Sequence, residues 1–582
     1  MKNLYTLKKY FARYKNKLLW GFIFIILSNI GTVFVPMLMK DSIDALQHNA
    51  TASILLQYGL MIVGASLFAG IFRFMIRQTI IVVSREIEFD LRGDFWKHIQ
   101  LLPLRYFQNT STGNIMAHAT NDINAVRMFI GPAVMYSIDT SVRLIMVLIL
   151  MLSLNTTLTI YALLPLPLLS ILVYKVGKLI HSKFTTIQEK FAQLTTLAQE
   201  NFSGIRVIKS YVREESEMKR YAEHSQDYLK KNMNLVRTQA LIMPILFLIT
   251  GLSIIIVIWL GGTKVINGEL TLGEITAFIV YLGILIWPMI AFGWVINIIQ
   301  QAEASMKRLN KIFAEPYEIN ETEKTNYLVK DVKGNIEFKN VSFRYNEHSP
   351  YILKNIKLKI PAGSTLAIMG YTGSGKTSLI NLIPRLYDCT EGEILIDGIN
   401  VKEMPLDVLR TNIGVVQQES FLFSDTILNN ISYGRREINP SLVDRVTEIA
   451  QFDKDVQEFP LKYETIVGER GITFSGGQKQ RACLARALAI DPKILILDDS
   501  FSAVDTSTEE EILKNLKNFM RERTSIMISH RISTVKDADK IIVLSESKIA
   551  EEGTHEQLIA KGGIYADLHY KQLLEQELEE IK

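Results

Sequence analysis

A glycine-rich loop in the second half of the chain contains the residue types that hold a nucleoside triphosphate. Residues 370–377 read Gly-Tyr-Thr-Gly-Ser-Gly-Lys-Thr, which matches the P-loop spacing G-x-x-x-x-G-K-[ST]. An apolar run, 366–369, precedes the loop as an expected strand, and an expected helix follows it. The glycines let backbone N–H groups turn toward phosphates, and Lys376 adds positive charge. The predicted binding residues are Gly370, Tyr371, Thr372, Gly373, Ser374, Gly375, Lys376, Thr377 and Ser378.

Other residues extend this site to a metal ion and a base. The hydroxyl of Thr377 is a ligand for Mg²⁺ in P-loop proteins, and Asp498 ends the apolar run 493–497 as the acid that holds the Mg²⁺ shell does. Tyr345 ends the run 341–345 and is suited to stacking on adenine. Taken alone, such an aromatic residue is more often a packing residue of the sheet.

The composition separates the chain into two halves. Of its 582 residues 48% are hydrophobic, and apolar runs of membrane-spanning length recur in the first half. The net charge of +4 gives no argument for nucleic-acid binding, so no nucleic-acid partner is predicted. Cys389 and Cys483 both lie in the half expected to be cytosolic, where reduced packing residues are favoured over a disulfide or a metal site.

Six apolar segments are predicted to cross the membrane, each near the roughly 20 residues that ~30 Å of hydrocarbon requires. They are about Leu18–Met39, Ile54–Ile76, Ile130–Leu154, Leu158–Val176, Leu241–Leu260 and Ile275–Ile298. Residues 1–17 contain basic residues and no acid, with apolar residues at helical spacing. This pattern predicts a basic amphipathic helix on the inner membrane surface. The following apolar run is too long for a signal peptide and has no small-residue cleavage site.

Charges in the loops set the orientation. The connections 77–129 and 177–240 are rich in Lys and Arg, as is the N-terminus, whereas 40–53, 155–157 and 261–274 have few basic residues. The positive-inside rule therefore places both termini and the two long loops in the cytosol. Both loops have helical periodicity and turn residues near 103–113 and 203–212, so the spans are expected to continue as helical hairpins with tips at those positions.

Polar and proline residues inside the spans leave two interpretations open. Asp139 and Arg143 lie four residues apart on one helix face, either marking a substrate path or neutralising each other near the inner interface; the second is favoured. Pro165, Pro167 and Pro288 are expected to kink their helices. The predicted domains are the membrane domain 18–301, a linker 302–334, the nucleotide domain 335–570 and a charged C-terminal helix or tail 571–582.

Five further motifs resemble those of one family. Residues 474–478, Phe-Ser-Gly-Gly-Gln, resemble the LSGGQ signature of ATP-binding cassette (ABC) transporters, with Phe in place of the first Leu. Gln418 lies where that family has its Q-loop glutamine, and His530 resembles its switch histidine. Gly468, Glu469 and Arg470 resemble the X-loop of exporters. Residues 502–505, which include Ser502 and Asp505, resemble the D-loop of the family. Nearly the whole chain resembles an exporter half-transporter of the multidrug or lipid type.

The resemblance implies a fold class, a mechanism and partners. The fold would be a polytopic α-helical membrane domain, with six spans and long cytosolic helical extensions, fused to an α/β P-loop nucleotide-binding domain. A second half-transporter would complete the ATP site, since the signature residues Phe474, Ser475, Gly476, Gly477 and Gln478 would meet the partner's P-loop. ATP and Mg²⁺ are the expected cofactors, with Thr377, Gln418 and Asp498 around the metal. Membrane lipid and a small amphipathic substrate are the other expected partners, at the cytoplasmic membrane.

One residue departs from the family pattern. The resemblance implies Glu after Asp498, where it polarises the attacking water, but this chain has Asp499. Asp is one methylene shorter, and a misplacement of about 1 Å can slow a reaction roughly 100-fold. The catalytic set is thus Asp499, His530 and Gln418, with slow hydrolysis expected at this chain's P-loop. A heterodimeric exporter of drugs or lipids is the favoured reading; a homodimeric lipid or peptide exporter, or a nucleotide-gated regulator or sensor, remains the alternative.

Overall fold

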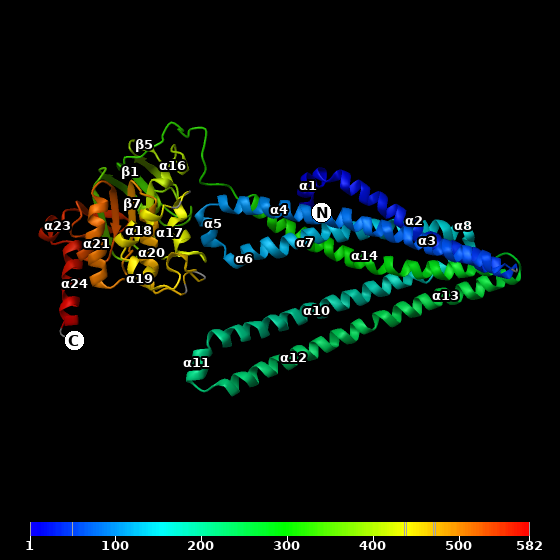
Figure 1. The fold of residues 1–582 in the computed structure, drawn as a ribbon. Coiled ribbons are helices and arrows are strands. Elements are labelled where there is room, and N and C mark those ends of the chain that lie inside the picture. Colours follow the sequence, from blue (N-terminus) through cyan, green and yellow to red (C-terminus); the bar gives the residue numbers. More distant parts are fainter. Residues whose placement is uncertain are drawn as a thin grey trace. The chain divides into compact units, whose positions relative to one another are not determined.

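The computed structural model describes residues 2–48, 50–435, 437, 439–468, 471 and 473–580. The chain forms two compact units (Figure 1). The first contains residues 1–98 and 113–314, and the second contains residues 99–112 and 315–582. The tip of the first long loop therefore belongs with the nucleotide-binding unit.

The first unit is helical throughout, as the apolar periodicity predicts. Its α-helices are α1 (Lys8–Arg13), α2 (Lys15–Gln47), α3 (Ala52–Ile76), α4 (Val82–Leu101), α6 (Thr112–Ala117), α7 (Ile123–Met128), α8 (Val134–Leu154), α9 (Thr156–Leu163), α10 (Leu166–Ser203), α11 (Ile205–Ser210), α12 (Glu214–Ala240), α13 (Ile242–Ile266) and α14 (Leu272–Phe313). A 3₁₀ turn, η1 (Asn3–Leu7), precedes them, and the π-helical segments η2 (Arg77–Ile81), η3 (His118–Asp122) and η4 (Phe129–Ala133) join neighbouring helices. The predicted spans thus continue into the long helices of the two loops, as predicted.

Five helical stretches among the described residues are long and apolar enough to cross a membrane: Lys15–Gln47, Ala52–Leu101, Thr112–Leu154, Glu214–Ile266 and Leu272–Phe313. The fourth predicted segment, 158–176, is divided between α9 and α10. Proline has no backbone N–H to donate to the preceding turn, and α9 ends before Leu164 and Pro165, although both residues keep α-helical backbone angles. Pro288, by contrast, lies inside the unbroken α14.

The second long loop folds as the expected hairpin. Helices α10 and α12 run side by side and are joined by α11 at the tip (Figure 1). Lys190 pairs with Asp227 across them at 3.0 Å, and the Lys183 ammonium donates to the Thr238 hydroxyl at 2.7 Å. Apolar side chains at the tip, Val207 and Tyr211 among them, are exposed within this chain.

The N-terminal segment packs against the protein along α4. Lys9, Arg13 and Lys17 pair with Asp94, Asp90 and Glu86 at 2.9, 2.7 and 2.6 Å. The apolar side chains of this segment, Leu7 and Tyr10, are buried within the unit. The segment is amphipathic as predicted, but its cations contact acids of α4. Its position at the membrane surface stays a prediction.

A polar cluster connects two predicted spans. Asn29 of α2 donates to Asp139 of α8 at 2.8 Å and accepts from Arg143 at 2.9 Å, while Arg143 pairs with Asp139 at 2.8 Å. Each charged group therefore has an opposite charge and a neutral amide as partners. These contacts fit the neutralising interpretation of Asp139 and Arg143.

The second unit contains an α/β core with two sheets. A six-stranded sheet has the order β10-β9-β3-β8-β7-β6, parallel except at β10, and a four-stranded antiparallel sheet has the order β2-β1-β4-β5. The strands are β1 (Ile336–Phe343), β2 (Leu353–Ile360), β3 (Thr365–Gly370), β4 (Glu391–Ile396), β5 (Ile399–Asn400), β6 (Ile413–Val416), β7 (Ile494–Asp498), β8 (Thr524–Ile528), β9 (Lys540–Ser545) and β10 (Lys548–Gly553). Their buried Ile, Leu and Val residues form the core between sheet and helices.

The helical elements of this unit are α5 (Leu104–Asn109), α15 (Lys376–Asn381), α16 (Leu406–Thr411), α17 (Ile427–Ile431), η5 (Ser432–Gly434), α18 (Pro440–Ile449), α19 (Asp453–Glu458), η6 (Lys462–Glu464), α20 (Gly476–Ala489), α21 (Thr506–Met520), α22 (Ile532–Val535), α23 (His555–Lys561) and α24 (Ile564–Glu580). Two predicted boundaries fall inside helices. The linker 302–334 begins within α14, and the division at residue 570 lies within α24.

Candidate functional site

The glycine-rich loop leaves the end of β3 in a geometry that only glycine tolerates. Gly370 has φ 144°, and a Cβ there would lie 2.4 Å from the carbonyl oxygen of Leu544. Gly375 has φ 97° and caps α15, the helix that begins at Lys376. Backbone in the left-handed region favours glycine because L side chains clash there. The loop therefore makes the tight, glycine-dependent turn that the P-loop spacing predicts.

Lys376 lies buried inside the loop. Its ammonium donates to the carbonyls of Gly370 and Tyr371 at 2.9 and 3.0 Å. Burial lowers the pKa of Lys376, while the charges of Asp498 and Asp499 act in the opposite direction. The buried hydroxyl of Ser374 has no hydrogen-bond partner among the described residues. A buried cation next to an unsatisfied hydroxyl fits a triphosphate, whose oxygens accept from both.

The acid predicted for the metal shell is almost fully buried at the end of β7. Burial raises the pKa of Asp498, and repulsion from Asp499 adds to the shift, against a hydrogen bond from Thr377. A buried carboxylate beside a second one is destabilised unless a cation is near. Carboxylate and hydroxyl oxygens are the ligands that Mg²⁺ prefers. Asp498 and Thr377 therefore fit a Mg²⁺ ion, which would neutralise charge on the phosphates.

One cavity of about 250 Å³ collects the predicted catalytic groups. The topology explains this, because β3, β7, β8 and β6 are parallel and their carboxyl ends meet at one edge of the sheet. The lining residues are Ile352, Thr372, Gly373, Gly375, Lys376, Thr377, Ser378, Gln418, Asp498, Asp499, Ile528 and His530. Residues separated by more than 150 positions in the sequence thus share one site.

Asp499 occupies a left-handed backbone position at the start of the loop after β7. Its φ is 47°, and its N–H donates to the carbonyl of Ile528 at 2.9 Å. This bond ties the backbone of Asp499 to the neighbouring strand β8. The backbone cannot shift toward the phosphates without breaking that bond, so the reach of the carboxylate depends on side-chain length.

Tyr345 lies half-buried at the end of the antiparallel sheet. Its hydroxyl bonds with that of Ser378 at 2.8 Å, and its ring meets Phe343 and Tyr387 edge-on at centroid distances of 5.0 and 5.3 Å. The ring therefore takes part in packing, and stacking on adenine stays a prediction. Its carbonyl also accepts from Arg105 of α5 at 3.2 Å, which links the loop tip 99–112 to this residue.

The signature residues lie at the start of a helix, α20. Ser475 caps α20 in a reciprocal pair: its hydroxyl accepts from the N–H of Gln478 at 3.2 Å, and Gln478 accepts from the N–H of Ser475 at 3.0 Å. A Cβ on Gly476 or Gly477 would approach Ala503 to 3.1 or 3.0 Å. The substituted Phe474 is buried and stacks on Phe459 at 5.1 Å, so it serves as a core residue.

The D-loop is tied to the signature helix. Gln480 of α20 donates to the Ser502 hydroxyl and accepts from the N–H of Ala503, both at 2.9 Å. Asp505 caps α21 by accepting from the Ser507 hydroxyl at 2.7 Å and from the N–H of Thr508 at 2.9 Å, and these bonds, the one from Ser507 most, hold the pKa of Asp505 well below its usual range. In the X-loop, the N–H of Gly468 donates to Thr473. Glu469 and Arg470 lie outside the described residues.

The structure adds two residues that sequence motifs missed. Gln572 of α24 donates to the carbonyl of His530 and accepts from the N–H of Ile532 at 2.9 Å. On the other side of the switch loop, the buried Glu509 of α21 pairs with Arg531 and accepts from Thr534 at 2.6 Å. The switch loop is thus held from two helices, at its backbone by Gln572 and at its side chains by Glu509. No local sequence pattern indicates these contacts, since they join residues more than 20 positions apart.

Gln572 is therefore expected to position His530. Replacing it by Ala removes two hydrogen bonds to the switch loop, and we expect the kcat for ATP hydrolysis to fall about tenfold. ATP affinity should stay unchanged, because Gln572 does not line the cavity. Gln572→Glu keeps the acceptor and should retain more activity than Gln572→Ala. A loss of affinity equal to the loss of kcat would contradict this positioning role.

Two family models match the chain. The model of the ABC transporter transmembrane region matches residues 18–289, and the ABC transporter model matches residues 353–502. Together they cover most of the sequence, in the two units that the fold separates. The chain belongs to the ABC transporter family.

Similar proteins indicate which type of ABC transporter this chain is. The chain is 36% identical to a probable multidrug resistance ABC transporter ATP-binding/permease protein, YheI of Bacillus subtilis, over 97% of this chain and 96% of that protein. It is 34% identical to an ATP-dependent lipid A-core flippase of Syntrophus aciditrophicus, over 94% and 91% of the two. A structure of a bacterial Atm1-family ABC exporter with ATP bound is similar with a TM-score of 0.79, at 27% identity, over 96% of this chain and 99% of that one. The chain is thus an exporter half-transporter: one membrane domain fused to one ATP-binding domain that drives transport.

Proposed function

We propose that this chain exports amphipathic or hydrophobic compounds, either drugs or lipids, across the cytoplasmic membrane. It acts as one half of a heterodimer in which its own P-loop forms the slower ATP site. Both termini and the nucleotide-binding unit are cytosolic. The names of the relatives, a multidrug resistance transporter and a lipid flippase, support this substrate class.

The observation that carries the slow site is Asp499. Its backbone is tied to β8 by the bond to Ile528, and its side chain is one methylene shorter than the glutamate of the family pattern. The other groups of the cavity, Lys376, Asp498 and His530, are in place for binding. The ATP-binding groups are thus all present, while one catalytic side chain is shorter. This combination favours a site that holds ATP and hydrolyses it slowly.

The need for a partner follows from the arrangement of the motifs. None of the described signature residues lines the cavity at this chain's own P-loop. The N-terminus of α20, with the N–H groups of Gly476 and Gly477, is suited to bind the terminal phosphate of ATP held by another chain. The exposed apolar tip at α11 is a second surface that a partner would cover.

The roles of the site residues follow from their positions. Lys376 and Ser374 would bind phosphate oxygens, and Thr377, Asp498 and Gln418 would hold a Mg²⁺ ion, which would neutralise charge on the phosphates. Asp499 would orient the attacking water, and His530 would contact the terminal phosphate. Closure of two such sites around ATP would move the tips at α5 and α11 and switch the membrane domain between inward- and outward-facing states.

A nucleotide-gated regulator is the second candidate, because slow hydrolysis at Asp499 also suits timing. A homodimeric lipid or peptide exporter is the third. Substrate-stimulated ATP hydrolysis together with ATP-dependent uptake into inverted vesicles supports either exporter. Nucleotide-dependent conformational change without flux supports the regulator.

Purification from the native membrane tests the dimer. We expect a second half-transporter with Glu at the position of Asp499 to co-purify, and ATP hydrolysis to be much faster in the pair than in this chain alone. The matched control is Asp499→Asn, which keeps the shape and removes the charge. Robust turnover by the lone chain that Asp499→Asn abolishes would refute the slow site.

A further inference from the structure

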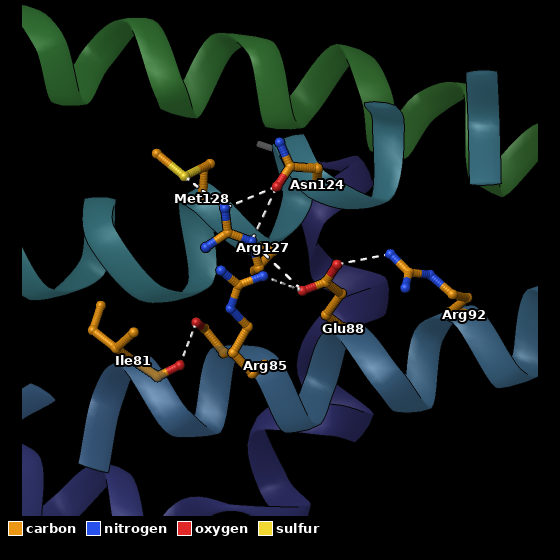
Figure 2. A network of polar contacts seen from close by, with 8 residues as sticks. Ile81, Arg85, Glu88, Arg92, Asn124, Arg127 and Met128 are labelled. Atoms are coloured by element: carbon orange, nitrogen blue, oxygen red, sulfur yellow. Dashed lines mark hydrogen bonds and ion pairs between the residues drawn. The ribbon is translucent and has the colours of Figure 1, made fainter. Parts of the chain in front are cut away.

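Three arginines surround one carboxylate that is 12% exposed, where α4 faces α7. Figure 2 shows Glu88 between Arg85 and Arg92 of its own helix, with Arg127 approaching from the other helix. Arg85 and Arg92 lie 3.0 and 2.8 Å from the two oxygens of Glu88, and Arg127 lies 3.6 Å from one of them. Among the described residues, no other carboxylate is within ion-pair distance of these guanidinium groups. The cluster therefore has an excess of two positive charges.

Arg127 is the least compensated of the three. Its side chain is 11% exposed, yet its nearest partners are neutral: the amide oxygen of Asn124 at 2.8 and 3.1 Å and the sulfur of Met128 at 3.1 Å. A thioether is a weak acceptor for a guanidinium donor. The nearest ion pair on the neighbouring turns, Asp122 with Arg308 of α14, is already satisfied. Glu86, Asp90 and Asp94 of α4 are likewise taken by the N-terminal cations.

The cluster lies on the cytosolic side of the predicted membrane boundary. Lys17 directly precedes the apolar run of α2, and its contact with Glu86 fixes the level of α4 at that boundary. Arg127 likewise precedes the apolar segment that begins at Ile130. Arg85 and Arg92 are 62% and 54% exposed, so both guanidinium groups are accessible to an anion from outside the helices.

We propose that Arg85, Arg92 and Arg127 form a binding site for a phosphate-type anion, supplied by the headgroup of an anionic phospholipid in the inner leaflet. Guanidinium groups offer paired N–H donors that match phosphate oxygens, and basic pockets between helices on the cytoplasmic side suit anionic headgroups. Glu88 keeps the three cations together when no anion is bound, and it competes with the anion for them. None of the three arginines lines the cavity of the candidate ATP site, so the two sites are separate.

Lipid binding by the purified full-length transporter tests the proposal. Native mass spectrometry with phosphatidylglycerol and phosphatidylcholine should show a tight site for the anionic lipid. The double variant Arg85→Gln/Arg92→Gln should weaken it about thirtyfold, since each basic group near an anionic membrane surface contributes roughly a factor of five. Arg77→Gln, which removes an exposed arginine just above α4, is the matched control and should leave the tight site unchanged.

A gain-of-function variant and a second ligand make the test decisive. Glu88→Gln removes the competing carboxylate and should tighten binding of phosphatidylglycerol. Inorganic phosphate, titrated into the detergent-solubilised protein, distinguishes the sources. Arginine-dependent binding of phosphate without lipid preference assigns the site to a soluble anion, whereas a preference for phosphatidylglycerol assigns it to lipid. If Glu88→Gln weakens binding, or the double variant and Arg77→Gln behave alike, the cluster only ties α4 to α7 and the proposal is wrong.

Discussion

Asp499→Glu is expected to raise the rate of ATP hydrolysis at this chain's P-loop about 100-fold, because the added methylene moves the carboxylate roughly 1 Å toward the attacking water. The backbone of Asp499 is tied to Ile528, so it does not compensate for the short side chain. The side chain lines an open cavity of about 250 Å³, which leaves room for the longer one.

The measurement isolates one site. Phosphate release is followed in the assembled transporter after the partner's own catalytic carboxylate has been replaced by its amide. Asp499→Asn serves as the matched control and should lower the already slow rate only a few-fold. If Asp499→Glu has no effect while Asp499→Asn abolishes hydrolysis, then Asp499 is a fully competent base and the dimer has two active sites.

Lys376→Ala is expected to weaken ATP binding at the same site about 100-fold, because two hydrogen bonds to a charged group contribute roughly 3 kcal/mol in total. The variant also removes the cation that faces Asp498 and Asp499, so the two carboxylates would repel the phosphates. Equilibrium binding of a fluorescent ATP analogue measures the change.

Lys357→Ala controls for loss of a lysine in the same domain. Lys357 lies exposed on β2 and does not line the cavity, so ATP affinity should not change. Thermal unfolding of both variants checks that the fold is kept. Nucleotide occupancy that is unaffected by Lys376→Ala would contradict the assignment of the loop at residues 370–377.

Local patterns predicted most of the ATP site. The spacing of Gly370, Gly375 and Lys376 is set by backbone geometry that glycine alone permits, and an acid after a buried strand identified Asp498. The resemblance to ABC transporters supplied Gln418 and His530, whose place in the cavity depends on parallel strands meeting at one sheet edge.

Contacts between segments that lie far apart in the chain could not be predicted from the sequence. Asn29 completes the cluster of Asp139 and Arg143 from another helix, and nothing in its local sequence indicates that role. The hydropathy pattern also did not indicate that a helix ends near Pro165, because the apolar run continues through the break between α9 and α10. Hydropathy depends on side-chain type alone, whereas the break between the helices comes from the backbone N–H that proline lacks.

The contact of Gln572 with the switch loop makes the C-terminal helix α24 part of the ATP-hydrolysing unit. A chain that ended at Gly563 would keep every ATP-binding motif and lose the whole of α24, and with it the contacts of Gln572 with the switch loop. The sequence motifs alone would not distinguish this shortened chain from the intact transporter. Truncation, proteolysis or a bulky fusion at this end therefore acts on the timing of hydrolysis from outside the nucleotide site.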